Sequence, residues 1–399
     1  MRRVIIYRNE LLPASETFVP AQANALQRYA PVFAGIRRVK SGLSITACPV
    51  ITVSPSEHVW KKLLRRIFLR TGRARAFQNA IVSYRPDLIH AHFATDACAV
   101  LPLAQQFRLP LVVTLHGYDV CCDDQAFRHW PTTRAYLRRR KALWQYASLF
   151  LCVSEHVRRQ AILRGFPQEK LSVHHIGVST RCAPVGAGQR GPATVLFVGR
   201  LVEKKGCNYL VRAMSGIVRE VSDAKLIIIG DGPLRNALEH EALPLGERVV
   251  FLGQQSHDQV MQWMRSARVL AAPSVCASDG DQEGLPTVLC EAQALGLPVV
   301  TFATNAVTEA LPGELRNAMP YERDEAGLAR AVVRLIQDGA QWKHASALGR
   351  QYMEEQFDIE RQTRTLEEIY DKVIADPVDK VRGSGTGRAS DMPEVLPVP

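Results

Sequence analysis

Short apolar runs alternate with segments of helical length along most of this chain, and this alternation limits the folds that it can adopt. The runs predicted to be strands are Val4–Tyr7, Leu88–Phe93, Leu111–Leu115, Leu149–Val153, Ala193–Val198, Lys225–Ile229, Val249–Leu252, Val269–Ala272 and Pro298–Phe302. The segments predicted to be helices are Phe18–Tyr29, Ala94–Phe107, Arg134–Tyr146, Asn208–Val221, Leu234–Leu243, Gln259–Arg265, Val288–Leu295 and Ile359–Val373. Strands that are apolar throughout are typical of parallel sheets covered by helices on both faces. The alternation therefore predicts the α/β class.

The segment Cys182–Pro192, which reads CAPVGAGQRGP, divides this pattern into two halves. Its Gly and Pro content is typical of a linker, and 399 residues are enough for two domains of ordinary size. We therefore expect two doubly wound domains, 1–185 and 193–350, that face each other across a cleft in which ligands bind. We expect the last helix, within 351–376, to return to the first domain, and the tail 377–399 to be disordered.

Charge is distributed unevenly between the two halves. The chain has a net charge of +11, and residues 1–185 hold 27 Lys and Arg against 10 Asp and Glu. The basic half is therefore expected to face an anionic partner, such as nucleic acid, phospholipid or a phosphorylated acceptor. No apolar run reaches the roughly 18 residues of a membrane span. We read the opening MRRVIIYRNE as a strand rather than a signal peptide and the nine scattered cysteines as free thiols, so we expect a cytoplasmic protein.

The segment EGLPTVLCE, from Glu283 to Glu291, is the most informative motif. A flexible loop leads into Pro286, which suits the first turn of a helix, and the free backbone N–H groups of such a turn can cradle a diphosphate. Glu291 lies two turns into that helix, where its carboxylate can accept hydrogen bonds from sugar hydroxyls. The alternative interpretation is that both glutamates are surface acids.

The segment VGRLVEKKG, from Val198 to Gly206, directly follows a predicted strand. Gly199 would allow a ligand to approach the backbone. Arg200 and Lys205 place two positive charges at the carboxyl end of the sheet, where α/β folds bind substrates. Such a pair suits a leaving diphosphate. The alternative is that both are solvated basic residues of a loop.

Together these two segments resemble the retaining nucleotide-sugar glycosyltransferases of family four, also called group 1, which have the GT-B fold. The resemblance continues through HAHF at His90–Phe93, TLHGYD at Thr114–Asp119 and GDGPL at Gly230–Leu234, and it covers the chain to about residue 375. The segment SETFV at Ser15–Val19, with Ser15 as a candidate helix N-cap, is most similar to bacterial exopolysaccharide enzymes of the colanic-acid type. The resemblance implies a fold of two Rossmann-like domains, in which the first binds the acceptor and the second binds the nucleotide sugar.

The resemblance implies a role for each matching residue. The implied catalytic residues, which hold the donor diphosphate or lie beside the transferred sugar, are His116, Arg200, Lys205 and Glu283. The implied donor-binding residues are Gly199, Leu252, Gly284, Leu285, Pro286, Thr287, Val288 and Glu291. Among these, Glu291 matches the glutamate that binds the ribose, and Leu252 lies near the nucleotide base. The implied acceptor-binding residues are Ser15, Glu16, Thr17 and His92.

We expect no metal ion and no other cofactor. His90 and His92 alternate on a strand and so face the same side, but no third ligand is evident. Asp279 and Asp281 match the D-x-D pattern of metal-dependent transferases. We nevertheless interpret them as solvated, because Arg200 and Lys205 already supply the positive charge that a metal ion would. The basic half lacks the interleaved aromatic residues of a single-strand binding platform, so we expect no nucleic acid partner.

The segment 60–75 has the pattern of an amphipathic basic helix. Its apolar stripe is Trp60, Leu63, Leu64, Ile67 and Phe68, and its basic residues are Lys61, Lys62, Arg65, Arg66, Arg70, Arg73 and Arg75. One interpretation is an ordinary surface helix packed on a sheet. The other is peripheral attachment to the anionic inner face of the plasma membrane, with 138–141 (RRRK) extending the surface.

The resemblance implies that the protein moves a sugar from a nucleotide-diphosphate donor to a lipid-linked saccharide acceptor in exopolysaccharide or surface glycan biosynthesis. The anomeric configuration would be retained by front-face attack, because no carboxylate is obviously placed as a nucleophile. Two alternatives are a nucleotide-sugar epimerase of the same architecture and a noncatalytic nucleotide-binding partner subunit. A noncatalytic subunit would be expected to lack a motif residue, and none of the motif residues named above is missing.

Overall fold

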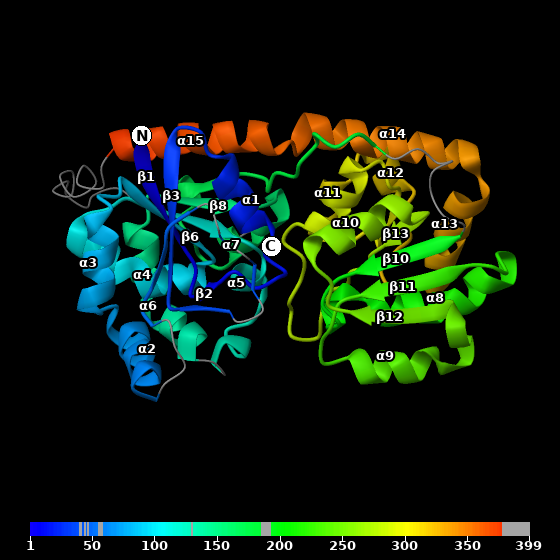
Figure 1. Ribbon diagram of the computed structural model, residues 1–399, viewed down its shortest axis with the longest axis horizontal. Helices are drawn as coiled ribbons and strands as arrows, with labels where there is room; N and C mark the ends of the chain where they lie inside the picture. Colours follow the sequence, from blue (N-terminus) through cyan, green and yellow to red (C-terminus); the bar gives the residue numbers. More distant parts are fainter. Residues whose placement is uncertain are drawn as a thin grey trace, which may run out of the picture.

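The structure, a computed structural model, describes residues 1–39, 42, 43, 45, 48–54, 59–128, 131–184 and 193–376. The predicted tail 377–399 and most of the predicted linker lie outside these residues. The described part of the chain forms two parallel sheets, one in each half of the sequence, with helices packed around them (Figure 1). The predicted α/β class is therefore confirmed.

The first sheet has seven parallel strands in the order β5-β3-β1-β6-β7-β8-β9. These strands are β1 (Arg2–Tyr7), β3 (Tyr29–Gly35), β5 (Val50–Thr52), β6 (Leu88–His92), β7 (Leu111–Leu115), β8 (Leu149–Cys152) and β9 (Leu171–Val173). The helices of this domain are α1 (Phe18–Ala25), α2 (Val59–Thr71), α3 (Arg75–Ser83), α4 (Ala94–Phe107), α5 (Tyr118–Cys121), α6 (Pro131–Tyr146) and α7 (Glu155–Leu163). A short strand β2 (Glu10–Leu11) pairs with β4 (Arg37–Arg38). Every residue of β6 and β7 is buried, as expected for central strands of a parallel sheet, although β6 includes two histidines and β7 a threonine.

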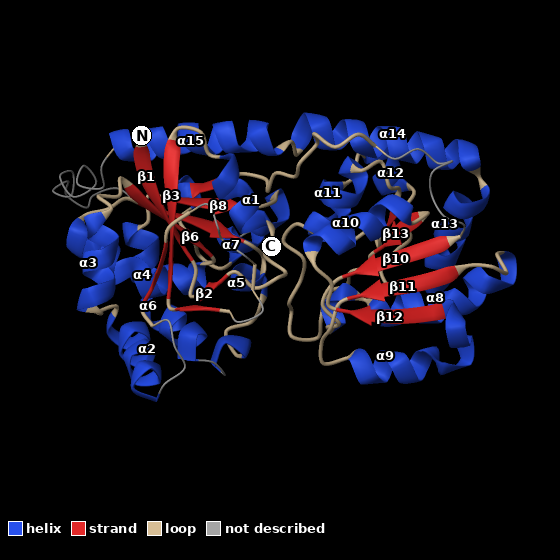
Figure 2. Cartoon of the chain, viewed as in Figure 1, coloured by secondary structure: helices blue, strands red, loops and turns tan. Residues whose placement is uncertain are grey.

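The second sheet has five parallel strands in the order β12-β11-β10-β13-β14. They are β10 (Thr194–Val198), β11 (Lys225–Ile229), β12 (Val249–Gly253), β13 (Val269–Ala271) and β14 (Val299–Val300). The surrounding helices are α8 (Cys207–Glu220), α9 (Arg235–Ala242), α10 (His257–Ser266), α11 (Thr287–Ala294), α12 (Gly313–Asn317) and α13 (Glu325–Gln337). The arrows of β10, β11 and β12 point towards the first domain (Figure 2). The loops at their carboxyl ends therefore face the other half of the molecule.

Strand order reverses once in each sheet, and this reversal positions the candidate site. In the first sheet the reversal lies between β1 and β6, and in the second it lies between β10 and β13. At such a point the connecting helices leave to opposite faces and open a crevice at the carboxyl ends of the strands. Arg8 follows β1 and Phe93 follows β6, while Gly199 follows β10 and Ser274 lies just beyond β13. The motifs found in the sequence therefore lie where an α/β fold binds ligands.

Two helices at the end of the chain, α14 (Gly339–Gln356) and α15 (Ile359–Ala375), extend along one side of both domains (Figure 1). Trp342 of α14 is buried in the second domain, where its Nε1 donates to the Arg268 carbonyl at 2.8 Å. Tyr370 of α15 is buried in a core cluster of the first domain. The carboxylate of Glu367 accepts hydrogen bonds from the backbone N–H groups of Gln27 and Arg28 at 2.7 and 2.6 Å. The last helix is thus bonded to the first domain.

The start of the first domain differs from the sequence prediction. The predicted helix Phe18–Tyr29 is too long, because α1 ends at Ala25 and Tyr29 begins β3. Ser15 is not the N-cap residue: that position is Thr17, whose side chain makes no capping hydrogen bond. The strand β3 lies between β1 and β5, so its apolar residues complete the first sheet.

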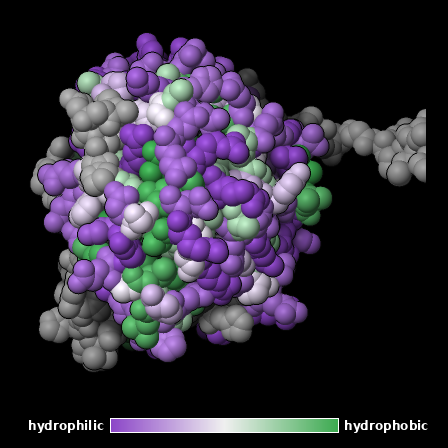
Figure 3. All heavy atoms as spheres, turned by 90° about the vertical axis from the view of Figure 1, so that its right-hand side faces the viewer, coloured by the Kyte–Doolittle hydropathy of each residue, from purple (hydrophilic) through white to green (hydrophobic). Residues whose placement is uncertain are grey.

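Helix α2 carries the clearest group of exposed apolar side chains in the first domain. Leu63, Leu64 and Ile67 are 48%, 47% and 42% exposed. Phe68 of the same apolar stripe is fully buried and packs edge-on against Phe77, so this part of the stripe follows the packed-helix interpretation. The opposite end of the molecule, seen in Figure 3, is mostly hydrophilic with a band of hydrophobic residues. None of the described helices has both the length and the apolar content needed to cross a bilayer.

Candidate active site

Two ion pairs hold the loop after β13 against the turn after β10. Lys205 Nζ lies 2.6 Å from Glu283 Oε1, and Lys204 Nζ lies 2.8 Å from Asp281 Oδ2. Lys204 and Glu283 are buried. Asp281 is therefore not solvated, and the earlier interpretation of this residue is wrong. The Lys204-Lys205 doublet in the sequence was the available signal for a second pair.

The positive charges around Glu283 keep its carboxylate ionised. Burial opposes ionisation, but Lys205, Lys204 and Arg200 together outweigh it and lower the pKa of Glu283 below its ordinary value. Ser274 Oγ lies 3.4 Å from the same carboxylate oxygen that Lys205 contacts. Arg200 is exposed, and no ion pair engages it among the described residues. The turn after β10 thus presents one free cation beside a fixed, charged carboxylate.

Two glycines of the GDGP segment hold this turn in place. A Cβ on Gly230, whose φ is +140°, would lie 1.9 Å from the Gly199 carbonyl oxygen. A Cβ on Gly232 would lie 2.5 Å from the Leu201 carbonyl oxygen. Gly199 is less restricted, since a Cβ there would meet its nearest neighbours at 3.5 Å or more. The glycines that the packing requires are therefore in the segment that supports Arg200, not in the turn itself.

The predicted donor-binding helix α11 begins at Thr287, with Pro286 at its N-cap position. The N–H group of Leu289 in its first turn donates to the Pro286 carbonyl at 3.0 Å. The N–H groups of Thr287 and Val288, which precede it, have no acceptor in the preceding turn and are available to an anion. Leu285 is buried, and Val288 lies in the first turn. Glu291 lies one turn further along, and burial raises the pKa of its carboxyl to about 7. Leu252 is half-buried on β12, and its carbonyl accepts a hydrogen bond from Gln255 at 2.8 Å.

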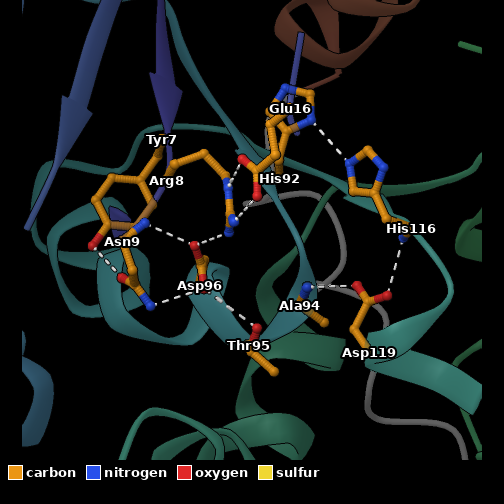
Figure 4. Close-up of polar contacts among 10 residues, drawn as sticks. All are labelled: Tyr7, Arg8, Asn9, Glu16, His92, Ala94, Thr95, Asp96, His116 and Asp119. Atoms are coloured by element: carbon orange, nitrogen blue, oxygen red, sulfur yellow. Dashed lines mark hydrogen bonds and ion pairs between the residues drawn. The ribbon is translucent and has the colours of Figure 1, made fainter. Parts of the chain in front are cut away.

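His116 and its loop provide the first domain's part of the site (Figure 4). His116 follows β7 and is partly exposed. The carboxylate of Asp119 accepts hydrogen bonds from the backbone N–H groups of His116 at 3.0 Å and Ala94 at 2.9 Å. Burial raises the pKa of Asp119 to about 6, although these N–H groups oppose the shift. Asp119 therefore joins the loop after β7 to the beginning of α4.

His92 lies behind His116 rather than in the cleft. Its side chain is 2% exposed, and its Nδ1 lies 3.0 Å from Nε2 of His116. The prediction that His92 contacts the acceptor is therefore wrong for this structure. Strand alternation alone cannot distinguish the two positions, because every residue of β6 is buried.

A buried network that the sequence did not reveal lies beside this histidine pair (Figure 4). Arg8 Nη2 lies 2.5 Å from Glu16 Oε1, Arg8 Nη1 bonds Asp96, and the Arg8 guanidinium lies 4.2 Å from the centroid of the Phe93 ring. Burial opposes the charge of Arg8, but Asp96 and Glu16 raise its pKa above the ordinary value. Glu16, predicted to bind the acceptor, is thus engaged by Arg8.

The remaining predicted acceptor residues stay on the surface. Ser15 is exposed and Thr17 is partly exposed. An arginine directly after the first apolar strand was the sequence signal for the Arg8 network, since that position lies at the carboxyl edge of the sheet.

The two halves of the site meet at a pair of glycines. A Cβ on Gly284 would lie 2.0 Å from the His116 carbonyl oxygen, and a Cβ on Gly117 would lie 2.9 Å from the Gly284 Cα. Gly117 also has a φ of +108°, which favours glycine. The structure therefore brings the backbone of His116 and Gly117 against Gly284, the residue that follows Glu283.

A small pocket borders this junction on the side of the second domain. Its lining includes Ser274, Gln282, Glu283, Thr304 and Glu322. The described residues contain no group of three or more His, Cys, Asp or Glu side chains placed to hold a metal ion. The site therefore offers carboxylates, one free cation, a histidine and backbone N–H groups.

Two protein families match the chain in consecutive segments. Residues 40–181 match glycosyltransferase family 4, and residues 192–338 match the glycosyl transferases group 1. This chain belongs to the family four glycosyltransferases. The glycosyltransferase WcaL of Escherichia coli, named for colanic acid biosynthesis, is 28% identical over 64% of this chain and 62% of its own length. The amylovoran biosynthesis glycosyltransferase AmsK of Erwinia amylovora is 28% identical over 72% of this chain and 70% of its own length.

Solved structures confirm the GT-B fold of this glycosyltransferase. The Anabaena protein HepE, in complex with UDP and glucose, superposes with a TM-score of 0.69 at 18% identity, covering 93% of this chain and 99% of HepE. The sucrose-phosphate synthase of Thermosynechococcus elongatus superposes with a TM-score of 0.73 at 21% identity, covering 94% of this chain and 100% of the synthase. At these identities the likeness concerns the fold alone.

Proposed function

We propose that this glycosyltransferase moves a sugar from a nucleoside diphosphate to a saccharide acceptor with retained configuration, in the synthesis of a surface polysaccharide. The observation that carries the proposal is the junction at Gly284, which follows the ion-paired Glu283 and packs against the backbone of His116 in the other domain. Lys205 and Glu283 are charged groups that can act on the sugar–diphosphate bond of a donor bound there. The names of the relatives, in colanic acid and amylovoran biosynthesis, support the polysaccharide context.

In this proposal the second domain binds the donor. Arg200 and Lys205 supply positive charge to the departing diphosphate, and the first-turn N–H groups of α11 add hydrogen bonds to it. Glu291 accepts hydrogen bonds from the ribose hydroxyls, and the base lies near Leu252. Structures of HepE with UDP and with UDP-glucose support a nucleotide-sugar donor.

The state of Glu283 favours front-face attack over a double displacement. Its carboxylate is bonded to Lys205 and kept ionised by three cations, so it is held in place and its charge is neutralised. A carboxylate in that state is a weak nucleophile. In the proposed mechanism the acceptor hydroxyl attacks on the face from which the diphosphate leaves, and a phosphate oxygen takes the hydroxyl proton. In this proposal no metal ion takes part, because Arg200 and the N–H groups at the start of α11 stabilise the charge of the diphosphate and Lys205 lies next to them.

We further propose that the acceptor is lipid-linked and that the enzyme works at the inner face of the plasma membrane. The exposed Leu63, Leu64 and Ile67 lie on the same helix as Arg66 and Arg70. An apolar patch beside basic residues favours the boundary of an anionic bilayer, where each Lys or Arg contributes about 1 kcal/mol. The side chains of Trp60, Lys61 and Lys62 lie outside the described residues.

A panel of nucleotide sugars tests the proposal. The cognate donor should raise the Tm of the protein, because a ligand of the native state stabilises it by mass action. The Arg200→Ala variant should lose most of that shift. Incubation with the cognate donor alone separates transfer from epimerisation, since an epimerase converts the donor without an acceptor. Absence of a shift with every nucleotide sugar would contradict the proposal.

A further inference from the structure

Three imidazole rings lie in a row behind the cleft face of the first domain. The ring centroids of His90 and His92 are 4.6 Å apart, and those of His92 and His116 are 5.3 Å apart. His90 is fully buried and His92 is 2% exposed, whereas His116 is partly exposed. His116 is therefore the ring of this row that a ligand in the cleft can touch, and His92 lies directly behind it (Figure 4).

All three rings are neutral at pH 7. Burial lowers the pKa of His90 to about 3, and burial holds the pKa of both His92 and His116 well below the ordinary value. The nearby charge of Arg8 lowers the pKa of His92 and His116 further. A neutral imidazole has one N–H group and one bare nitrogen. The position of the proton therefore decides what each ring offers to its neighbours.

One hydrogen bond couples the tautomers of His92 and His116. His92 Nδ1 and His116 Nε2 are 3.0 Å apart, so one of them donates and the other accepts. If His92 donates, His116 Nε2 is bare and the proton of His116 is on Nδ1. If His116 donates, its Nδ1 is bare and the proton of His92 is on Nε2. His116 thus offers the cleft a donor in the first case and an acceptor in the second.

The second nitrogen of His92 distinguishes these two cases. His92 Nε2 is buried and has no hydrogen-bond partner among the described residues. The neighbouring His90 offers none, because its Nδ1 is bonded to Tyr370 Oη at 2.6 Å and its Nε2 to Thr114 Oγ1 at 2.7 Å. Buried N–H groups without an acceptor are rarer in folded proteins than acceptors without a donor. The proton of His92 therefore belongs on Nδ1.

We propose that His92 is a positioning residue that holds His116 in the tautomer with its proton on Nδ1, so that His116 presents a hydrogen-bond donor to the sugar in the cleft. The catalytic consequence rests on the proposed function, whereas the tautomer is a property of the free protein. The assigned roles thereby change: His92 acts through His116 and does not touch the acceptor.

Nitrogen NMR of the free, full-length protein labelled with ¹⁵N-histidine tests the tautomer. Long-range proton–nitrogen correlations distinguish an N–H nitrogen from a bare one, and the His116→Asn variant identifies the His116 signals by their loss. At pH 7.5 we expect His116 to have a protonated Nδ1 and a bare Nε2. A protonated Nε2 on His116 would overturn the inference, even if the protein transfers sugar.

A pair of variants of nearly equal shape separates positioning from packing. In His92→Asn the amide can still donate to His116 Nε2, and we expect the His116 tautomer to persist and kcat to fall less than about threefold. In His92→Asp an ionised carboxylate can only accept, so the proton of His116 should move to Nε2. Its kcat should fall about tenfold, the effect of losing one neutral hydrogen bond in the transition state.

The control variant is His174→Gln, which removes a buried imidazole of the same domain that lies near His90, at the end of the row away from His116. Its amide can replace the bond from His174 Nε2 to the Gln362 carbonyl, which is 2.9 Å long. We expect the His116 signals and kcat to be unchanged. Equal losses in the Asn and Asp variants, with the His116 tautomer the same in both, would show that His92 merely fills space. If the wild type shows the expected tautomer but no nucleotide sugar is transferred, the proposed function fails and the tautomer assignment stands.

Discussion

At the residue scale, most charged side chains near the cleft are already paired in the free protein. Lys205 with Glu283 and Arg8 with Glu16 are examples. Among the residues that the structure describes, Arg200 and Glu291 take part in no ion pair. In the proposed function these two groups gain a charged or polar partner from the donor, so they make the clearest targets for substitution.

Removal of either cation of the turn after β10 should slow turnover strongly. Arg200→Ala and Lys205→Ala each remove a charge that the proposed function assigns to the departing diphosphate, and such a loss typically costs about 3 kcal/mol, or roughly a hundredfold in kcat. Lys225→Ala is the matched control, because Lys225 is exposed at the opposite end of the same sheet. Steady-state kinetics of the three variants check the prediction. Transfer at wild-type rates by both site variants would contradict the proposed role of Arg200 and Lys205 in binding the diphosphate.

The raised pKa of Glu291 gives stability a characteristic pH dependence. Its carboxyl has a pKa of about 7 in the folded protein, against about 4.3 for an unfolded chain. The folded state therefore binds more protons between these values, and the stability that Glu291 contributes is lost as pH rises through 7. Glu291→Gln should melt higher than wild type at pH 8, and the difference should vanish below about pH 4.3. Melting curves of both proteins across this pH range check the sign of the Tm difference between variant and wild type.

Glu291 should also make donor binding pH-dependent. If its ionised carboxylate accepts ribose hydroxyls, nucleotide affinity falls as pH drops below 7, since the carboxyl is then protonated. The Glu291→Gln variant should bind more weakly and show little change between pH 6 and pH 8. Titration calorimetry with the cognate nucleoside diphosphate measures both. A wild-type affinity that is flat over this range would argue against contact between Glu291 and the ribose.

At the scale of elements, fully apolar strands and long helices could be predicted from the sequence, but contacts between distant segments could not. Helix α4 and strand β7 have the predicted bounds because their apolar residues are buried in the first domain's core. Strand β3 is absent from the predicted strands, and it contains Pro31, a residue that weakens a strand pattern. The sheet tolerates Pro31 because β5 pairs with β3 only from Phe33 onward, so no strand lies where a backbone N–H at position 31 would point.

In the candidate site too, the sequence predicts which motifs take part but not every contact between distant segments. The pairing of Glu283 with Lys205 joins two predicted motifs, and their shared position at the carboxyl edge of one sheet follows from the topology. The Arg8–Asp96 bond and the burial of His92 could not be predicted, because they depend on the register of β1 and β6. Sequence spacing carries no information about that register.

The exposed face of α2 should bind anionic membranes in a salt-sensitive way. Changing Lys61, Lys62, Arg65 and Arg66 to Gln removes charge but keeps Leu63, Leu64 and Ile67, so vesicle binding should fall while transfer to a soluble acceptor analogue continues. Cosedimentation with phosphatidylglycerol vesicles at low and high salt measures the effect, since the Debye length is about 8 Å at physiological ionic strength. Equal, salt-independent cosedimentation of variant and wild type would favour an ordinary surface helix.

A carboxylate of the second domain caps a helix of the first. Glu309 accepts hydrogen bonds from the backbone N–H groups of Glu155 and His156, at the start of α7, at 2.7 and 2.8 Å. Loss of a cap typically costs about 1 kcal/mol, and here that loss also weakens the contact between domains. Glu309→Ala should lower the free energy of unfolding and increase the radius of gyration in solution scattering. Glu314→Ala, which loses only a contact to His344 of the same domain, is the control. An unchanged radius for Glu309→Ala would argue against a domain-closing role.

At the scale of the whole molecule, two parallel sheets direct the loops at their carboxyl ends at each other, and helices α14 and α15 join the domains along one side (Figure 1). The loop that carries Glu283 reaches the first domain at Gly117, so the residues of each domain complete the site of the other. This arrangement explains why the proposed chemistry needs both halves of the chain.

Transfer itself is the most direct test of this account. The purified protein is incubated with its cognate nucleotide sugar and with lipid-linked saccharides, and mass spectrometry follows the acceptor while released nucleoside diphosphate is measured. The account predicts an acceptor heavier by one sugar, one nucleoside diphosphate released per sugar added, the same anomeric configuration in product and donor, and activity in excess EDTA. A product of inverted configuration, or activity that EDTA abolishes and a divalent ion restores, would contradict it.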